Sequence, residues 1–409
     1  MKLGITILYA LVLPYIGLML MVILGMLRTR QAERRSDLPS VTVVLPAHNE
    51  EVRLKQTLLS LSRQEYAGEV EFVIVDDRST DSTASIIRAL ARQDARFRLV
   101  SVTEPGRRFS PKVNAVNHGI RASLGEVIVT TDADCEYPPG WIGEMVAHFT
   151  EGVVMVVGYV ETTRAWRAPG RLQMFETSDW LSLMLTSRSL TRFGMKFASS
   201  ANNQAYLRSA FEQAGGFGAP GRAPSGDEDL LTQRLGRLDG AKIVFASTPA
   251  SRVLTRPVGS LPQLLNQRRR WVSRYHHLMH YEPAFLASIA LLGFQSIALS
   301  AALLVLPFFP AAAPWVLGLL ALKLTVEMTG KSIGTGQFGR RDLWWLPSLG
   351  WALMHPFFIA AMVIMSFARP GDWAGGNEGY RSRYYRRLAQ QFLRRLRPRA
   401  SRTVDAHRP

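Results

Sequence analysis

Short apolar segments that end in polar or acidic residues most constrain how this chain can fold. Val41–Pro46, Glu71–Asp76 and Glu126–Thr131 have the length and β-branched content of buried strands. Glu51–Arg63 has the apolar spacing of a helix, and Ser82–Gln93 is a second helix candidate. Strands that alternate with helices predict an α/β fold with a mostly parallel, doubly wound sheet. Ligands of such sheets bind beyond the carboxyl ends of the strands.

Long uncharged segments flank this region. Residues 3–27 carry no charge and are long enough to cross a bilayer. The basic stretch that follows them indicates an uncleaved membrane segment, with the N-terminus outside and the basic flank in the cytoplasm. Three more apolar segments follow at residues 284–306, about 311–328 and 344–367.

The Arg-rich tail conflicts with a simple count of these segments. After Phe367 the chain holds 11 Arg, no Lys and 3 acidic residues, a net charge of +8. Four complete crossings would place this tail outside, whereas the cation bias places it inside. Either one segment does not cross completely, or the tail violates the charge rule. Pro347 and Pro356 interrupt 344–367, so this is the segment that we favour as re-entrant or interfacial. The sequence does not decide between these alternatives.

Composition narrows the class of protein further. The formal net charge of +17 is concentrated at membrane flanks and in the tail, which favours attraction to anionic lipids and not nucleic-acid binding. Cys135 is the sole cysteine, so an intrachain disulfide and a thiolate metal cluster are excluded, and we assign it a packing role. The predicted order is a transmembrane segment (1–28), an α/β domain (29–283) with an interfacial helix near 262–282, membrane-embedded helices (284–367) and the tail (368–409).

Asp132 and Asp134 follow the third predicted strand. Two carboxylates one residue apart can converge on one cation where a strand gives way to a turn, and oxygen ligands suit Mg²⁺ or Mn²⁺. Either ion can also bridge to a diphosphate and neutralise its charge. Histidines in this chain lack the spacing of a zinc site, so we interpret them as surface or interface residues.

The ends of the first two predicted strands are candidates for binding a nucleotide. A carboxylate there can accept hydrogen bonds from a base or a ribose, and the next helix N-terminus attracts anions. The alternative is that Ser79 and Asp81 simply cap that helix. Lys112 is a further candidate, with a solvated lysine as its alternative. The predicted nucleotide-binding residues are Pro46, Asn49, Glu50, Asp77, Lys112 and Asp132.

Two later clusters complete the candidate site. Asp229 opens a predicted helix with Leu230, Leu231 and Leu235 facing inward. It is a candidate general base, because clustered carboxylates raise each other's pKa; an acidic helix N-terminus with a structural role is the equal alternative. In the basic cluster that precedes the second membrane segment, an arginine can bind a diphosphate and a tryptophan can face a sugar. Its candidate functional residues are Gln267, Arg270 and Trp271, whereas Arg268, Arg269 and Arg274 are expected at the level of lipid headgroups.

The order Asp-Asp, Asp-x-Asp, x-Glu-Asp and Gln-x-x-Arg-Trp between Val41 and Trp271 resembles the family 2 inverting glycosyltransferases with a GT-A fold. Within that family it is similar to the membrane-integral branch of cellulose, chitin and hyaluronan synthases and ceramide glucosyltransferases. The chain departs from many relatives at Phe197–Asn203, where a Gly-containing loop is frequent, which leaves the acceptor open. The resemblance implies these roles: Asp77 at the nucleoside, Asp132 at ribose or metal, Asp134 at the metal, Asp229 as base, and Gln267, Arg270 and Trp271 at diphosphate and acceptor.

The function that this resemblance implies is transfer of a sugar, expected from a UDP-sugar, to a lipid acceptor, with inversion and with Mg²⁺ or Mn²⁺. A processive polysaccharide synthase is the alternative, and a binding protein with an inactive fold is a third hypothesis. The amphipathic segment Leu172–Leu190 is a candidate acceptor entrance or core helix. The expected location is a bacterial inner membrane with the catalytic domain in the cytoplasm. The sequence does not determine the sugar, the acceptor or the oligomeric state.

Overall fold

The computed structural model describes most of the chain up to residue 368. The described residues are 2–28, 34–104, 109–162, 170–197, 200–218, 227–272 and 281–368. They lie within one unit, Met1–Gly371, and the predicted Arg-rich tail lies outside the described residues.

A seven-stranded sheet forms the centre of the α/β region, with strand order β3-β2-β1-β4-β8-β6-β9. Its strands are β1 (Val41–Ala47), β2 (Val70–Asp77), β3 (Phe97–Val102), β4 (Val127–Thr130), β6 (Val153–Gly158), β8 (Gln204–Leu207) and β9 (Lys242–Ala246). The pairs β1–β2, β1–β4, β2–β3 and β6–β9 are parallel, whereas β8 is antiparallel to both β4 and β6. The predicted mostly parallel sheet is confirmed, and all three strands predicted from the sequence are present.

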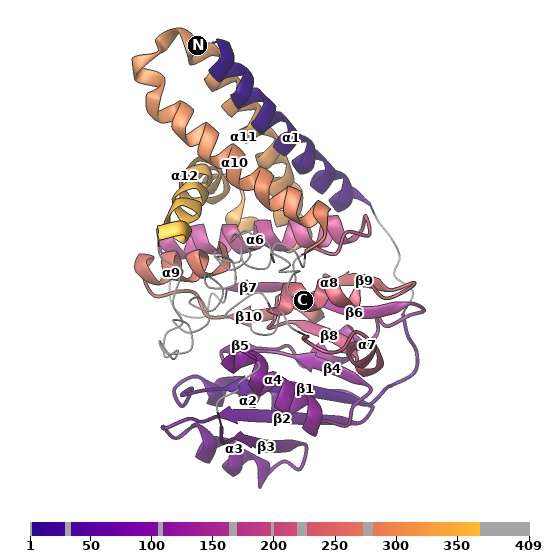
Figure 1. Ribbon diagram of the computed structural model, residues 1–409. Coiled ribbons are helices and arrows are strands. Elements are labelled where there is room, and N and C mark those ends of the chain that lie inside the picture. The colour runs from indigo at the N-terminus through magenta and orange to yellow at the C-terminus, as the bar shows by residue number, and fades with distance from the viewer. Residues whose placement is uncertain are drawn as a thin grey trace, which may run out of the picture. The chain divides into compact units, whose positions relative to one another are not determined.

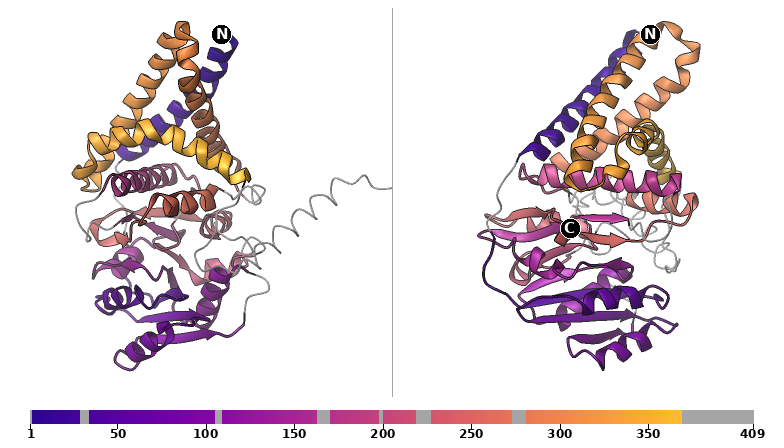
Figure 2. Two further views of the ribbon diagram at one scale, coloured as in Figure 1. Left: turned by 90° about the vertical axis from the view of Figure 1, so that its left-hand side faces the viewer. Right: turned by 180° about the vertical axis from the view of Figure 1, so that it is seen from behind.

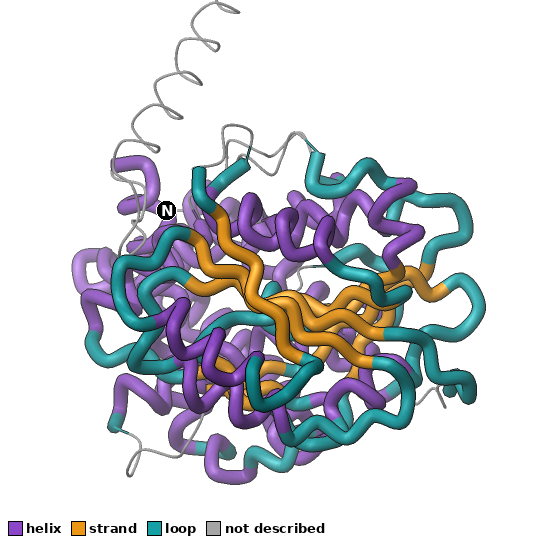
Figure 3. Tube along the Cα trace, turned by 90° about the horizontal axis from the view of Figure 1, so that it is seen from below, coloured by secondary structure: helices purple, strands orange, loops and turns teal. Residues whose placement is uncertain are grey.

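Both faces of this sheet are buried, which explains its nearly continuous apolar strands. Along β1, Val43 and Leu45 join one hydrophobic cluster while Val44 joins the other. β2 alternates in the same way, because successive side chains of a strand point to opposite faces. Figure 3 shows the strands between helices. The sheet is accompanied by α2 (Leu54–Ser62), α3 (Thr83–Ala91), α4 (Pro111–Ala122), α5 (Trp141–Val146), α7 (Arg208–Gln213) and α8 (Asp227–Leu235).

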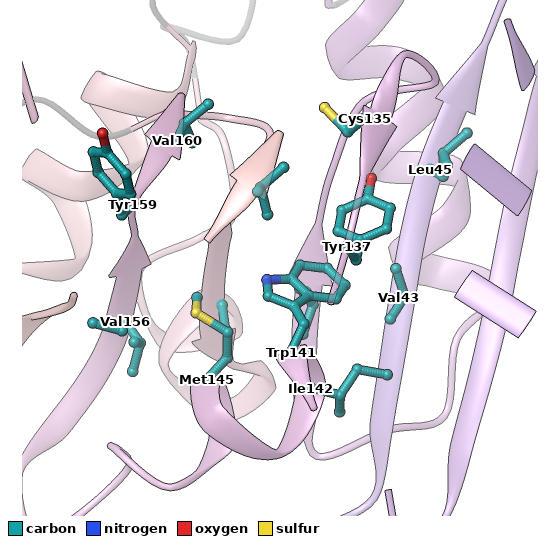
Figure 4. Close-up of a cluster of buried hydrophobic side chains, with 14 of the residues drawn as sticks. Val43, Leu45, Cys135, Tyr137, Trp141, Ile142, Met145, Val156, Tyr159 and Val160 are labelled. Carbon is teal, nitrogen blue, oxygen red and sulfur yellow. The ribbon is translucent and has the colours of Figure 1, made fainter. Parts of the chain in front are cut away.

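A smaller sheet continues the core beyond β4. It consists of β5 (Cys135–Glu136), β10 (Val253–Thr255) and β7 (Val160–Thr162), with β10 in the centre. Trp141 and Tyr137 stack beside it with ring centroids 4.3 Å apart, and Figure 4 shows both rings among the buried side chains. Cys135 is fully buried there, which confirms its packing role.

Among the residues that the structure describes, four helices are long and apolar enough to cross a membrane, judged by length and composition. They are α1 (Lys2–Leu27), α10 (Pro283–Val305), α11 (Ala313–Gln337) and α12 (Leu346–Ala368). Short 3₁₀ turns lie at Pro249–Ser251, Leu306–Phe308, Pro310–Ala312 and Arg341–Leu343. In Figure 1 α12 is seen nearly end-on, whereas α1 and α10 are seen from the side. The left view of Figure 2 shows α12 running across the other three apolar helices.

The structure corrects two predictions about these segments. Pro347 and Pro356 do not interrupt 344–367: Pro347 lies in the first turn of α12, where its missing N–H has no intrahelical partner to lose, and the helix continues through Pro356. The predicted segment at about 311–328 is too short, because α11 runs to Gln337. Its charged residues are tolerated within the helix because they are buried and have polar partners: Lys323 binds Glu327 at 2.7 Å, and Lys331 donates to the Ser178 carbonyl.

Two further helices lie between the α/β region and the apolar helices. They are α6 (Arg171–Thr191) and α9 (Leu261–Val272). α6 packs against α1 and α12, and α9 also packs against α12. The predicted amphipathic segment Leu172–Leu190 is therefore helical, and the described part of the predicted interfacial helix ends at Val272.

Candidate active site

The carboxyl ends of β1, β2 and β4 lie side by side, because β1 pairs in parallel with both neighbours. The polar residues that follow these strands are thereby brought to one edge of the sheet. This edge carries all the predicted nucleotide and metal residues, with Lys112 supplied by the first turn of α4.

The loops after β1 and β2 are joined by hydrogen bonds. The backbone N–H of Asn49 donates to Ser79 Oγ at 3.0 Å, and the backbone N–H of Thr80 donates to Asn49 Oδ1 at 2.8 Å. Asn49 and Arg78 both have left-handed backbone conformations, with φ of 56° and 60°. Asparagine tolerates that conformation and arginine adopts it less readily. The two loops are therefore held together by their hydrogen bonds, and Asp81 also caps α3, because its Oδ1 accepts a hydrogen bond from the backbone N–H of Thr83 at 2.9 Å.

Asp77 is buried and paired with its neighbour. Its Oδ1 lies 2.8 Å from Arg78 Nε, and its backbone carbonyl lies 2.6 Å from His48 Nδ1. The carboxylate is thus held in one orientation at the strand end. The sequence did not indicate Arg78 or His48, because neither belongs to a spaced motif.

Asp132 forms an ion pair with Lys112, whose Nζ lies 2.7 Å from Asp132 Oδ1. The lysine is therefore not simply solvated, which was the alternative interpretation. The turn that carries Asp132 is anchored from both sides: Thr57 Oγ1 donates to the Ala133 carbonyl at 2.8 Å, and the hydroxyl of Tyr137 donates to the Asp132 carbonyl at 3.3 Å.

The carboxylates at this edge repel one another. Burial, followed by the charge of Asp132, raises the pKa of Asp134. Burial also raises the pKa of Glu50, with Asp134 and Asp132 contributing in the same direction and Arg53 opposing them. A cation bound here would relieve this repulsion. The described residues contain no group of three or more His, Cys, Asp or Glu side chains placed to hold a metal. Two carboxylates nevertheless fit a Mg²⁺ or Mn²⁺ ion that also takes substrate phosphates and waters as ligands.

Asp229 lies in the first turn of α8 and is 1% exposed. Leu230, Leu231 and Leu235 are buried as predicted. Leu230 packs with Tyr281 and Phe285 at the start of α10, so α8 is fixed against the apolar helices as well as the sheet. A carboxylate in this position can be both rigid and shielded from water.

α9 presents the third group of predicted residues. Trp271 packs edge-on against Trp180 of α6, with ring centroids 5.2 Å apart, and Gln267 accepts a hydrogen bond from Arg268 Nη1 at 2.8 Å. Arg268 is 4% exposed, so its predicted place at the lipid headgroups is wrong. Arg270 is half-buried in the same turn. Arg274 and the histidines at 276, 277 and 280 lie outside the described residues.

The segment that departs from the resemblance, Phe197–Asn203, contains a structural residue. Asn203 is fully buried and donates from Nδ2 to the carbonyls of Tyr159 and Ser251, at 2.9 and 2.8 Å. Its Oδ1 accepts from Trp141 Nε1 at 2.9 Å. Asn203 therefore connects the two sheets, and its side-chain hydrogen bonds are made within the buried core.

The mostly parallel sheet, with its polar residues gathered at the strand ends, has the architecture of a GT-A-type α/β domain. Residues 42–215 match the family Glycosyl transferase family 2, so the chain contains a Glycosyl transferase family 2 domain. It is 33% identical over 138 residues to the undecaprenyl-phosphate 4-deoxy-4-formamido-L-arabinose transferase of Pseudomonas aeruginosa, covering 32% of this chain and 40% of that protein. It is 27% identical over 251 residues to the beta-monoglucosyldiacylglycerol synthase of Nostoc, covering 60% of this chain and 50% of that protein.

The chain thus spans half or less of the length of these two relatives. Among solved structures, it is similar to the mannosyltransferase PcManGT from Pyrobaculum calidifontis in complex with GDP-Man and Mn²⁺, with a TM-score of 0.58 and 18% identity. That similarity covers 89% of this chain and 99% of the mannosyltransferase. At this identity the similarity supports the fold alone.

Proposed function

We propose that this protein transfers one sugar from a nucleotide-sugar, a UDP-sugar in the first instance, to a hydroxyl group of a membrane lipid acceptor, with inversion. The observation that carries the proposal is the group formed by Asp132, Asp134 and Lys112 at the strand ends of a family 2 domain that is joined to apolar helices. Both relatives named above act, by their names, on lipid-linked or lipid acceptors. A lipid substrate also fits a catalytic domain held at a membrane.

Donor binding would use the strand-end loops. Asn49 and Asp77 hold the nucleoside, and Lys112 approaches the diphosphate from the first turn of α4, where the helix dipole also favours negative charge. Asp132 and Asp134 would hold Mg²⁺ or Mn²⁺, which would neutralise the leaving diphosphate when bound. The Mn²⁺ in the mannosyltransferase complex supports this assignment.

Transfer would occur in one displacement. Asp229 accepts the proton of the acceptor hydroxyl, whose oxygen forms a bond to the anomeric carbon on the face opposite the diphosphate. The bond from that carbon to the diphosphate oxygen breaks, and its electron pair leaves with the nucleoside diphosphate. Arg270 stabilises the negative charge that develops there. Gln267 and Trp271 orient the acceptor and the sugar.

Release of nucleoside diphosphate tests this function. Purified protein in lipid, with Mn²⁺ or Mg²⁺, is incubated with UDP- and GDP-sugars, with and without a lipid extract. The expected result is lipid-dependent release from one donor, with a glycolipid product that carries a single sugar of inverted configuration. A long polymer as the product would indicate a processive synthase instead. No release with any donor or lipid would contradict the proposed transfer.

We also propose a membrane topology in which α1, α10 and α11 cross a bacterial inner membrane and α12 lies along its cytoplasmic face. α12 packs on α6 and α9 and runs across the other three apolar helices (Figure 2). Three crossings that start from an external N-terminus leave the α/β domain and the Arg-rich tail in the cytoplasm, which agrees with the bias of cations to that side.

Labelling with a membrane-impermeant maleimide checks this topology. The sole native cysteine, Cys135, is fully buried, so cysteines introduced as Lys2→Cys and Ser401→Cys provide the accessible thiols. We expect Lys2→Cys to be labelled from outside intact cells and Ser401→Cys only in inverted vesicles. Labelling of both from the same side would mean that α12 also crosses. The unmodified protein serves as the control for reaction at Cys135.

A further inference from the structure

Asp179 of α6 is a buried carboxylate at the meeting point of three helices. Its side chain is 7% exposed. Its Oδ2 lies 2.8 Å from Arg268 Nε of α9, and its Oδ1 accepts a hydrogen bond from Trp351 Nε1 of α12 at 3.3 Å. His355 of α12 lies 3.8 Å from the same Oδ1. One carboxylate therefore contacts both the helix that carries the basic cluster and the last apolar helix.

The guanidinium of Arg268, which pairs with Asp179, also contacts two residues of the candidate site. Its Nη1 donates to Gln267 Oε1 at 2.8 Å, and its Cζ lies 4.0 Å from the centre of the Trp271 ring. Its Nη2 is buried and has no hydrogen-bond partner among the residues that the structure describes. Asp179 is thus the direct ion-pair partner of Arg268, with Glu176 of the same helix as a further negative charge near it, while Arg268 touches the two residues assigned to orient acceptor and sugar.

The physical setting makes this ion pair sensitive to the loss of one partner. Burial by itself raises the pKa of Asp179, but the positive charge of Arg268 and a further contribution from His355 outweigh it and hold the pKa below its usual value. The carboxylate is therefore charged. Removal of one member of a buried pair leaves an uncompensated charge, whereas removal of both does not.

A second contact links the same part of α6 to α11. Lys331 Nζ donates to the Ser178 carbonyl and lies 4.0 Å from the centre of the Trp351 ring. α11 and α12 are thereby connected to the residue next to Asp179. A displacement of α11 or α12 would therefore also move this part of α6 and, through the ion pair of Asp179 with Arg268, α9.

We propose that Asp179 and Arg268 are positioning residues for the transfer reaction: their buried ion pair places Gln267 and Trp271 on α9 and ties that placement to α12. This rests on the proposed function, in which Gln267 and Trp271 orient the acceptor and the sugar. Neither Asp179 nor Arg268 touches the reacting atoms in this proposal. Their effect passes through the position of α9.

The test compares Asp179→Asn, the double variant Asp179→Asn/Arg268→Gln and the control Glu327→Gln. Glu327 belongs to another buried ion pair, in which it binds Lys323 and accepts a hydrogen bond from Tyr15 of α1 at 2.6 Å, so its loss has a comparable structural cost away from α9. Three quantities are measured on the full-length protein in lipid: the thermal midpoint, hydrogen exchange of the 261–272 segment, and the transfer rate at saturating donor.

We expect Asp179→Asn to lower the thermal midpoint, speed exchange in α9 and reduce the transfer rate about a hundredfold, the size of loss that small misplacements of reacting groups cause. The double variant should recover most of the midpoint, because neither Asp179 nor Arg268 is left as a buried charge without the other, while exchange in α9 stays fast and transfer stays low. Glu327→Gln should lower the midpoint without a selective change of exchange in α9.

Two results would overturn the proposal. One is a double variant that recovers both stability and transfer, since the pair would then be only structural. The other is an Asp179→Asn variant whose α9 exchange equals that of the wild type or of Glu327→Gln. If the wild type transfers no sugar from any donor, the proposed function fails. Hydrogen exchange still decides in that case whether the pair positions α9, because it needs no substrate.

Discussion

The Asp229→Asn variant is expected to lose transfer by about 10²–10⁴-fold, the contribution of a positioned general base. Asparagine has the shape of aspartate but cannot accept the acceptor's proton. Because Asp229 is buried in the first turn of a helix whose leucines pack into the core, we expect the fold and donor binding to persist. The measurements are the transfer rate, the affinity for nucleoside diphosphate and the thermal midpoint.

Asp239→Asn is the matched control for this variant. Asp239 is exposed and lies just beyond the same helix, so the substitution removes the same charge without changing the buried site. It should keep the transfer rate of the wild type. If Asp229→Asn retained more than about a tenth of the activity, the proton would have to go to another group, and Asp229 would be left with only a structural role at its helix terminus.

The Asp134→Asn variant is expected to abolish the response of the enzyme to Mg²⁺ or Mn²⁺ and to lower kcat/KM by about 10²–10³-fold. Loss of charge stabilisation at the leaving diphosphate is worth several kcal/mol, and each 1.36 kcal/mol corresponds to about tenfold in rate. Asp134 shares its edge of the sheet with Asp132 and Glu50, whose mutual repulsion a cation would relieve. Metal titrations of activity and direct Mn²⁺ binding measure the effect.

Asp77→Asn provides the contrasting variant. Asp77 is held by Arg78 at the neighbouring strand end, so its loss should weaken nucleoside binding while activity still rises on addition of metal. If both variants lost the metal response equally, the assignment of Asp77 to the nucleoside and of Asp134 to the metal would be wrong. Wild-type activity that persists after complete chelation of divalent cations would rule out the metal at Asp132 and Asp134.

The features of this protein that depend on local pattern could be predicted from its amino-acid sequence. Alternating strand and helix segments predicted a mostly parallel sheet, and both carboxylates of the third strand end were placed correctly at its edge, because a parallel sheet brings such ends together. The inward leucines of α8 follow from helical periodicity, and the uncharged segments follow from the thickness of a bilayer. Each of these patterns is contained within a short stretch of the sequence.

The features that depend on contacts between residues distant in sequence became apparent from the folded protein. Arg268 looked like a headgroup arginine because its neighbours in sequence are basic, but Asp179 removes it from the surface. The charges of α11 made its segment look short, yet pairing within the bundle lets the helix run to Gln337. Residues that pair over a long distance in the sequence do not produce a local periodic pattern by which the pair could be predicted. The free energy of a buried charge depends on the partner that meets it in the folded protein.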